Sequence, residues 1–107
     1  MKFIVLAKYT KQGTDGWLDN PGEDRHAMIS GMAKKMGGSL HDLTYTRGEY
    51  DVAATVEAPS LDTMTAMKLA MLKTGAIAEL KILEGIDLNA IAKQASEFIG
   101  IYKAPGS

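Results

Sequence analysis

The sequence contains no cysteine among its 107 residues, and it has only one tryptophan and two histidines. Without thiols the chain cannot form a disulfide scaffold, a thiolate zinc site, an iron–sulfur cluster or a cysteine nucleophile. The length leaves no room for two independent cores, so we predict a single domain over residues 1–107. Any chemistry that this domain performs must rest on oxygen and nitrogen groups.

The chain also lacks an excess of charge of either sign. Twelve lysines and arginines oppose thirteen aspartates and glutamates, which gives a net charge of −1. Proteins that bind nucleic acids or anionic membrane surfaces need a basic surplus, so we expect neither partner here. The apolar run at Phe3–Ala7 stops at Lys8, too early for a secretory leader or a membrane span. We therefore predict a cytoplasmic protein.

Several chemical signatures are missing as well. The sequence has no phosphate-binding loop, no dinucleotide fingerprint and no Gly-x-Ser-x-Gly nucleophile elbow. Glu23 and His26 have the spacing used in carboxylate-bridged di-iron bundles, but such sites need a second copy and further carboxylates. The alternative is a surface histidine near a helix start. We expect no metal and no cofactor.

Hydrophobic periodicity predicts seven elements of secondary structure. Strands are expected at 3–9, 39–47, 51–58 and 77–83, and helices at 23–36, 60–74 and 87–99. This order is the split βαβ plan of the ferredoxin-like fold: an α+β domain of βαββαβ order with an antiparallel sheet, helices on one face and an extra C-terminal helix. The ferredoxin-like core then covers residues 3–84.

Start signals support two of these helices, and a methionine stripe supports the third. Ser60 and Asp87 are good N-cap residues. Met28, Met32 and Met36 recur every four residues on one helix face. Such a stripe is typical of a buried helix face, and a copper- or peptide-binding surface is the alternative.

Residues 11–22 contain three glycines and one proline, a composition typical of a long loop. Loops of this length often act as lids over a binding site. Trp17 lies in its middle, where it could close a pocket or anchor the loop to the body of the domain.

The two faces of the first strand are both apolar. Ile4 and Leu6 point one way, and the other face carries Phe3, Val5, Ala7 and Tyr9. Two helices cover only one face of a four-stranded sheet, so the second face needs a cover of its own. A homodimer that pairs these faces would supply it, and the C-terminal helix is the alternative cover.

A set of short landmarks gives the chain a resemblance to a known family. They are Tyr9-Thr10, Gln12-Gly13, Pro21, Arg25, Gly37-Gly38, Gly48-Glu49-Tyr50-Asp51, Glu57-Ala58-Pro59 and Gly75. In this order they resemble GYD-domain proteins, which are named for the Gly-x-Tyr-Asp hairpin. The resemblance implies a dimeric α+β barrel, in which ferredoxin-like domains pair through their sheets around an inner cavity. It implies no agreed activity.

One departure from that family concerns the last strand. Many relatives carry an Arg-Thr-x-Thr-like stretch there, where this chain has Ala78-Glu79-Leu80-Lys81. If those polar residues line a ligand site in the family, the ligand chosen here will differ.

Six residues are our candidates for a ligand-binding site: Tyr9, Trp17, Arg25, His41, Tyr45 and Glu57. Arg25 could hold an anionic group of a ligand, or it could brace the loop by pairing with Asp19 or Asp24. The Tyr50-Asp51 pair has either a catalytic role or, more simply, a structural role in the hairpin.

His41 and Glu57 are the candidate acid–base groups. Strand alternation places His41 on the face of Leu43 and Tyr45, where it could be a general base or a hydrogen-bonded structural residue. Glu57 lies beside apolar positions, where burial would raise its pKa, or it could pair with Lys8 or Lys81 across the sheet.

Three functions follow from these observations. The leading prediction is a small-molecule-binding homodimer or higher homo-oligomer with a pocket between sheet and helices. The first alternative is a small cofactor-free enzyme of the oxygenase or isomerase type that uses His41 or Glu57 as its base. The second is an oligomerisation or regulatory module without a pocket.

Overall fold

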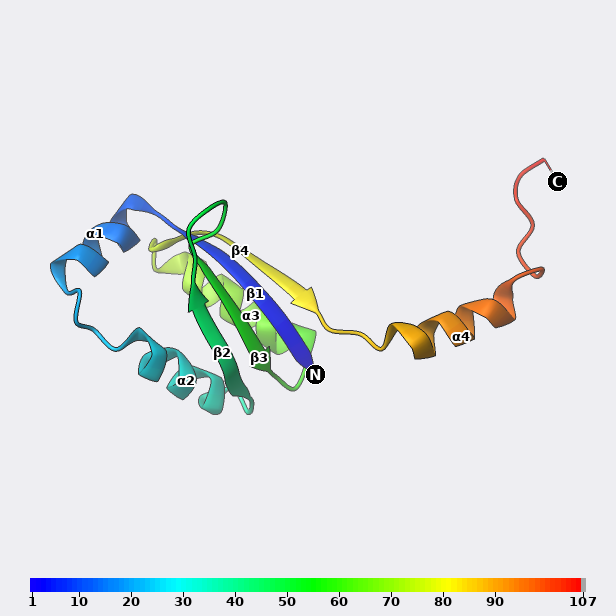
Figure 1. The fold of residues 1–107 in the computed structure, drawn as a ribbon, viewed down its shortest axis with the longest axis horizontal. Helices are drawn as coiled ribbons and strands as arrows, with labels where there is room; N and C mark the ends of the chain where they lie inside the picture. The colour runs from blue at the N-terminus through cyan, green and yellow to red at the C-terminus, as the bar shows by residue number, and fades with distance from the viewer. Residues whose placement is uncertain (107) are drawn as a thin grey trace.

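Four strands form one antiparallel sheet in this protein, and four helices accompany it (Figure 1). The structure is a computed structural model that describes residues 1–106. The elements are β1 (Lys2–Tyr9), α1 (Lys11–Asp19), α2 (Arg25–Lys35), β2 (Ser39–Tyr45), β3 (Val52–Glu57), α3 (Leu61–Lys73), β4 (Ile77–Glu84) and α4 (Leu88–Phe98). All seven predicted elements are present, within two residues at each end.

The strand order β2-β3-β1-β4 confirms the ferredoxin-like prediction. Val5 lies opposite Ala54 of β3 and Ile82 of β4, and these side chains share one face of the sheet. Ile4 lies opposite Thr55 and Leu83 on the other face. We call the first the covered face and the second the open face.

The core lies on the covered face. Phe3 and Met64 are fully buried, and Val56 packs with them. At the opposite end of the sheet Ala7 and Leu80 form a second buried cluster. Helix α2 packs beside β2 and helix α3 beside β4, and Met64 of α3 reaches the two inner strands.

Helices α2, α3 and α4 each begin at an N-cap side chain. The hydroxyl of Ser60 accepts a hydrogen bond from the amide of Thr63, and Asp87 does the same for Ala90 at the start of α4. Both caps were predicted. Asp24 caps α2 by accepting from the amide of Ala27, so the helix begins one residue later, at Arg25.

The prediction of a loop over residues 11–22 is wrong. Thr10 caps a helix there, because its hydroxyl accepts a hydrogen bond from the amide of Gly13 at 3.1 Å. Gly13 lies so close to the carbonyl of Ala76 that a side chain would not fit. Gly13, one of the glycines that favoured a loop in the sequence, therefore allows α1 to pack against the segment that precedes β4.

Helix α4 projects away from the rest of the chain (Figure 1). None of its residues is buried. The radius of gyration is 18.3 Å, whereas a compact chain of this length has about 13 Å. The alternative that the C-terminal helix covers the open face of its own sheet is therefore wrong for this conformation.

Candidate ligand-binding site

An apolar cavity of about 360 Å³ lies between the covered face of the sheet and helices α2 and α3. Its floor includes Val5 and Ala54, and methionines form much of its walls. Those methionines are Met28 and Met32 of α2 and Met67 and Met71 of α3. The side chains predicted to fill a helical core thus leave a space that their flexible thioethers can reshape.

Polar groups gather at one end of the cavity. Tyr9, Arg25 and Ala76 line it and also line a second, smaller cavity of about 210 Å³. The second cavity has a more polar wall, to which Gln12, Trp17 and Glu23 contribute. We call it the vestibule, because it shares these three residues with the apolar cavity.

An aromatic cluster ties α1 to the sheet beside the vestibule. The ring centroids of Tyr9 and Trp17 are 5.8 Å apart, and those of Trp17 and Tyr45 are 4.9 Å apart, both in edge-to-face geometry. Of the two roles considered for Trp17, the geometry supports the anchor: the indole holds α1 against β1 and β2. It also lines the vestibule, so it can report on an occupant.

Arg25 stands at the junction of the two cavities. Its guanidinium is 3.4 Å from the carboxylate of Glu23, and about a quarter of its side chain is exposed. Asp19 and Asp24, the predicted partners, do not pair with it among the ion pairs of the described residues. The guanidinium has five N–H donors, and the exposed carboxylate of Glu23 can accept from only some of them. Arg25 therefore retains donors for an anionic or hydrogen-bond-accepting group.

The phenols of Tyr9 and Tyr45 both have raised pKa values. Burial raises the pKa of Tyr9, and Tyr45 and Asp51 add to the rise while Arg25 opposes it. Burial also raises the pKa of Tyr45, again against the effect of Arg25. Both phenols therefore stay protonated near neutral pH, and Tyr9, which lines both cavities, presents its hydroxyl group to the site.

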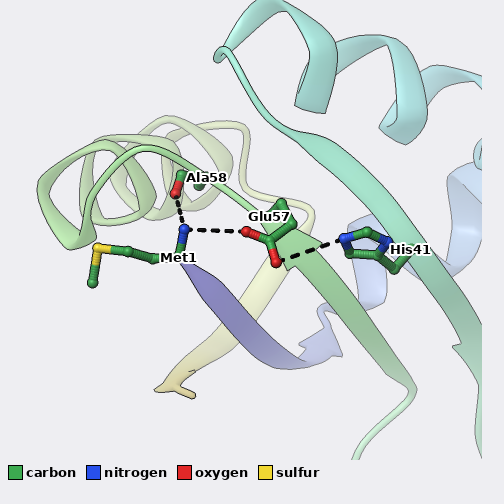
Figure 2. Close-up of polar contacts among 4 residues, drawn as sticks. All are labelled: Met1, His41, Glu57 and Ala58. Carbon is green, nitrogen blue, oxygen red and sulfur yellow. Dashed lines mark hydrogen bonds and ion pairs between the residues drawn. The ribbon is translucent and has the colours of Figure 1, made fainter. Parts of the chain in front are cut away.

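His41 and Glu57 lie elsewhere, on the open face (Figure 2). His41 Nε2 is 3.8 Å from one carboxylate oxygen of Glu57, and the amino group of Met1 is 3.1 Å from the other. Neither residue lines the apolar cavity or the vestibule. Four of the six candidate residues thus come together, and these two do not join them.

Two sequence-based placements are corrected here. The register of β2 shifts between Leu40 and Asp42, so His41 is the extra residue of an irregularity and does not share a face with Leu43 and Tyr45. Glu57 does not pair with the predicted lysines. Lys8 and Lys81 pair instead with Glu79, at 3.5 and 3.4 Å.

The sequence of the chain matches a known domain family. The profile of the GYD domain matches residues 3–95. The chain belongs to the GYD-domain family. No protein of curated function matches the sequence of this GYD protein significantly. Among solved structures it is similar to the one described as "crystal structure of FFRP-DM1", with 17% identity and a TM-score of 0.50 over 79% of this chain and 97% of that chain. That likeness supports the ferredoxin-like fold alone.

The Gly-x-Tyr-Asp motif of the GYD protein connects the hairpin to the site. Gly48 has a φ of +140°, which favours glycine. The ammonium groups of Lys8 and Lys81 lie 5.1 and 5.8 Å from the ring centroid of Tyr50, on the open side. Asp51 accepts a hydrogen bond from the backbone amide of Tyr9 at 2.8 Å. The motif therefore fixes the end of β1, which carries the Tyr9 side chain into both cavities.

The lining of the cavity is the part of the site that the sequence analysis missed. Met67, Met71 and Thr74 were treated as parts of a helix and its end, although they form one wall. The available signal was the unusual share of methionine, seven residues in the chain.

No helix among residues 1–106 is long and apolar enough to cross a membrane.

Proposed function

We propose that this GYD-domain protein binds a small, largely apolar molecule in the cavity between the sheet, α2 and α3. The observation that carries the proposal is a space of about 360 Å³ with an almost wholly apolar lining. Ligand pockets start at roughly 300 Å³. Apolar cavities hold water poorly and take up apolar molecules instead. A pocket of this kind also speaks against a module that only oligomerises.

The polar end of the ligand would lie at the junction with the vestibule. Arg25 offers a cation there, and Tyr9 offers a protonated hydroxyl group. A carboxylate or another acceptor on the ligand would match both groups. The ligand class is therefore amphipathic: an apolar body with one acidic or acceptor head.

Homodimerisation through the open face is the second part of the proposal. Ile4 is 39% and Leu83 is 49% exposed, side by side on that face near the end of β4. Pairing two open faces would bury both. The alternative enzymatic function has no such support, because its candidate bases, His41 and Glu57, lie outside both cavities.

Matched ligand pairs test the binding proposal: octanoate against octanol, and benzoate against benzyl alcohol. We expect the acids to raise the Tm and to change the fluorescence of Trp17, which lines the vestibule. Arg25→Gln should weaken binding of the acids and leave binding of the alcohols nearly unchanged. Absence of any Tm or fluorescence change with all four probes would contradict the proposal.

Two alanines of α3 provide a matched steric control. Ala70 lines the cavity, whereas Ala66, one turn earlier, is exposed and does not. Ala70→Leu should reduce the affinity for the probes, because the larger side chain narrows the cavity. Ala66→Leu should leave it unchanged. Equal effects of the two variants would show that the probes bind somewhere other than this cavity.

A further inference from the structure

Helix α4 carries a continuous apolar stripe that stays exposed among residues 1–106. Leu88, Ile91 and Phe98 are 65%, 45% and 58% exposed, and they lie on one side of the helix at helical spacing. Beyond the helix, Ile99, Ile101 and Tyr102 are more than 70% exposed. We call residues 86–102 the arm.

A helix of this length is not stable by itself. Isolated helices shorter than about 12–15 residues are marginal in water, and α4 has 11. The cap of Asp87 on the amide of Ala90 secures only the first turn. The stabilisation that an amphipathic helix normally gains from packing must therefore come from another molecule.

The start of the arm is directed away from its own sheet. The amide of Gly85 donates a hydrogen bond to the carbonyl of Lys2 at 2.7 Å, which continues the pairing of β4 with β1 past the end of the strand. A side chain at Gly85 would stand 3.0 Å from that carbonyl. The pairing with β1 thus extends to Gly85, and α4 follows beyond the end of the sheet (Figure 1).

A membrane surface is a poor match for the arm. The polar side of α4 carries one lysine and one glutamate, Lys93 and Glu97. Helices that lie on anionic membranes have polar faces rich in lysine and arginine. The apolar surface of the arm instead begins close to the open face: Leu83 lies at the end of that face, and Ile86, 60% exposed, follows three residues later.

The exposed area also fits a protein partner. The seven large apolar residues of the arm expose on the order of 800 Å² together, at about 150–200 Å² for a fully exposed large side chain. They are Ile86, Leu88, Ile91, Phe98, Ile99, Ile101 and Tyr102. A stable interface buries about 800 Å² on each partner. Two arms in a symmetric pair supply this area from both sides.

We propose that the arm crosses to a second copy of this chain and buries its apolar stripe there, as an extension of the open-face interface. This inference rests on the homodimer of the proposed function and is independent of the ligand cavity. It predicts that the arm holds the dimer together and that α4 is stable only in the dimer.

The test compares glutamate substitutions on the two sides of α4 in the full chain. Ile91→Glu and Phe98→Glu place a charge in the stripe, whereas Asn89→Glu places it on the opposite side of the helix. Analytical ultracentrifugation over a dilution series should give a dimer for the wild type. Each stripe variant should raise the Kd of the dimer by at least roughly tenfold, and Asn89→Glu should leave it unchanged.

Two further measurements distinguish the contribution of the arm to the dimer from that of the open face. Amide hydrogen exchange over residues 88–98 should be slow in the wild-type dimer and fast in the stripe variants, with β1 and β3 protected in both. Ile4→Glu tests the open face alone. If it raises the Kd while Ile91→Glu does not, the sheet-to-sheet dimer stands and the proposal for the arm is overturned.

Three other outcomes would also overturn the proposal. They are a wild-type chain that remains monomeric at high concentration, an equal loss of dimer in Asn89→Glu and Ile91→Glu, and recruitment of a monomer to phosphatidylserine-containing vesicles through the arm. Binding of octanoate is measured separately. Its presence or absence tests the cavity and has no bearing on the role of the arm.

Discussion

The indole of Trp17 meets the ring of Tyr45 edge to face, with 4.9 Å between the ring centroids. On its other side the same indole meets Tyr9 at 5.8 Å. Helix α1 has no buried residue, so these ring contacts join α1 to β1 and β2 where no buried side chain does. The place of Trp17 in the wall of the vestibule therefore depends on the two tyrosines.

Trp17→Ala should detach α1 from the sheet. Aromatic pairs contribute about 0.5–1.5 kcal/mol each beyond the buried area, so the loss of two should lower the free energy of unfolding by about 1–3 kcal/mol. Urea unfolding followed by circular dichroism measures it. Leu18→Ala is the control on the same helix: Leu18 is 71% exposed, and its change should stay within about 0.5 kcal/mol. Equal losses would refute the anchoring role.

Asp51→Ala should destabilise the domain through β1. It removes the acceptor of the Tyr9 amide, and a partly buried donor left without a partner costs about 1–3 kcal/mol. Asp51→Asn keeps an acceptor oxygen and should cost less. Urea unfolding ranks the two variants. If Asp51→Ala matched the wild type, the motif would have no role in fixing the end of β1.

Gly38→Ala and Gly31→Ala should change stability in opposite directions. A side chain at Gly38 would overlap the carbonyl of Glu57, so this variant should lose about 3 kcal/mol or fail to fold. Gly31 lies inside α2 with nothing near the added methyl group. Alanine there should raise the free energy of unfolding by about 0.5–1 kcal/mol. Thermal unfolding of the pair checks the sign of each change.

Stability should fall in alkaline solution because of Tyr9 and Tyr45. Burial raises both pKa values above the unfolded value of 10.0. Above that pH the unfolded chain loses these protons while the folded chain keeps them, so the unfolded state is favoured. The stability is fully present below pH 10.0 and is lost as the pH rises through the folded pKa values. Tyr9→Phe should flatten the decline in urea titrations, and an unchanged slope would contradict this assignment.

The fold was predictable because its signals are local. Caps such as Ser60 and Asp87, and the period of each apolar stripe, depend on neighbouring residues, and the structure confirms them. Helix α1 was missed for the opposite reason. Its glycines weaken the helix locally, and the compensating contacts, such as that of Gly13 with Ala76, join residues far apart in the sequence.

The candidate site was predictable only in part, because alternation along a strand fails at irregularities. Tyr9, Trp17, Arg25 and Tyr45 lie together as one group, although their function stays a prediction. The register shift in β2 sends His41 to the open face, toward Glu57. No periodic pattern signals such a shift. The methionine-lined cavity was equally hidden, because a buried stripe and the wall of a cavity have the same spacing.

The irregularity at His41 also lies in β2, an outer strand of the sheet. An outer strand offers unpaired amides and carbonyls to any extended segment that aligns with it. The extra residue interrupts the regular spacing of those groups, so an incoming strand cannot pair along the full length of β2. Growth of the sheet by edge-to-edge stacking is thereby disfavoured on this side, which is compatible with the proposed pairing through the open face.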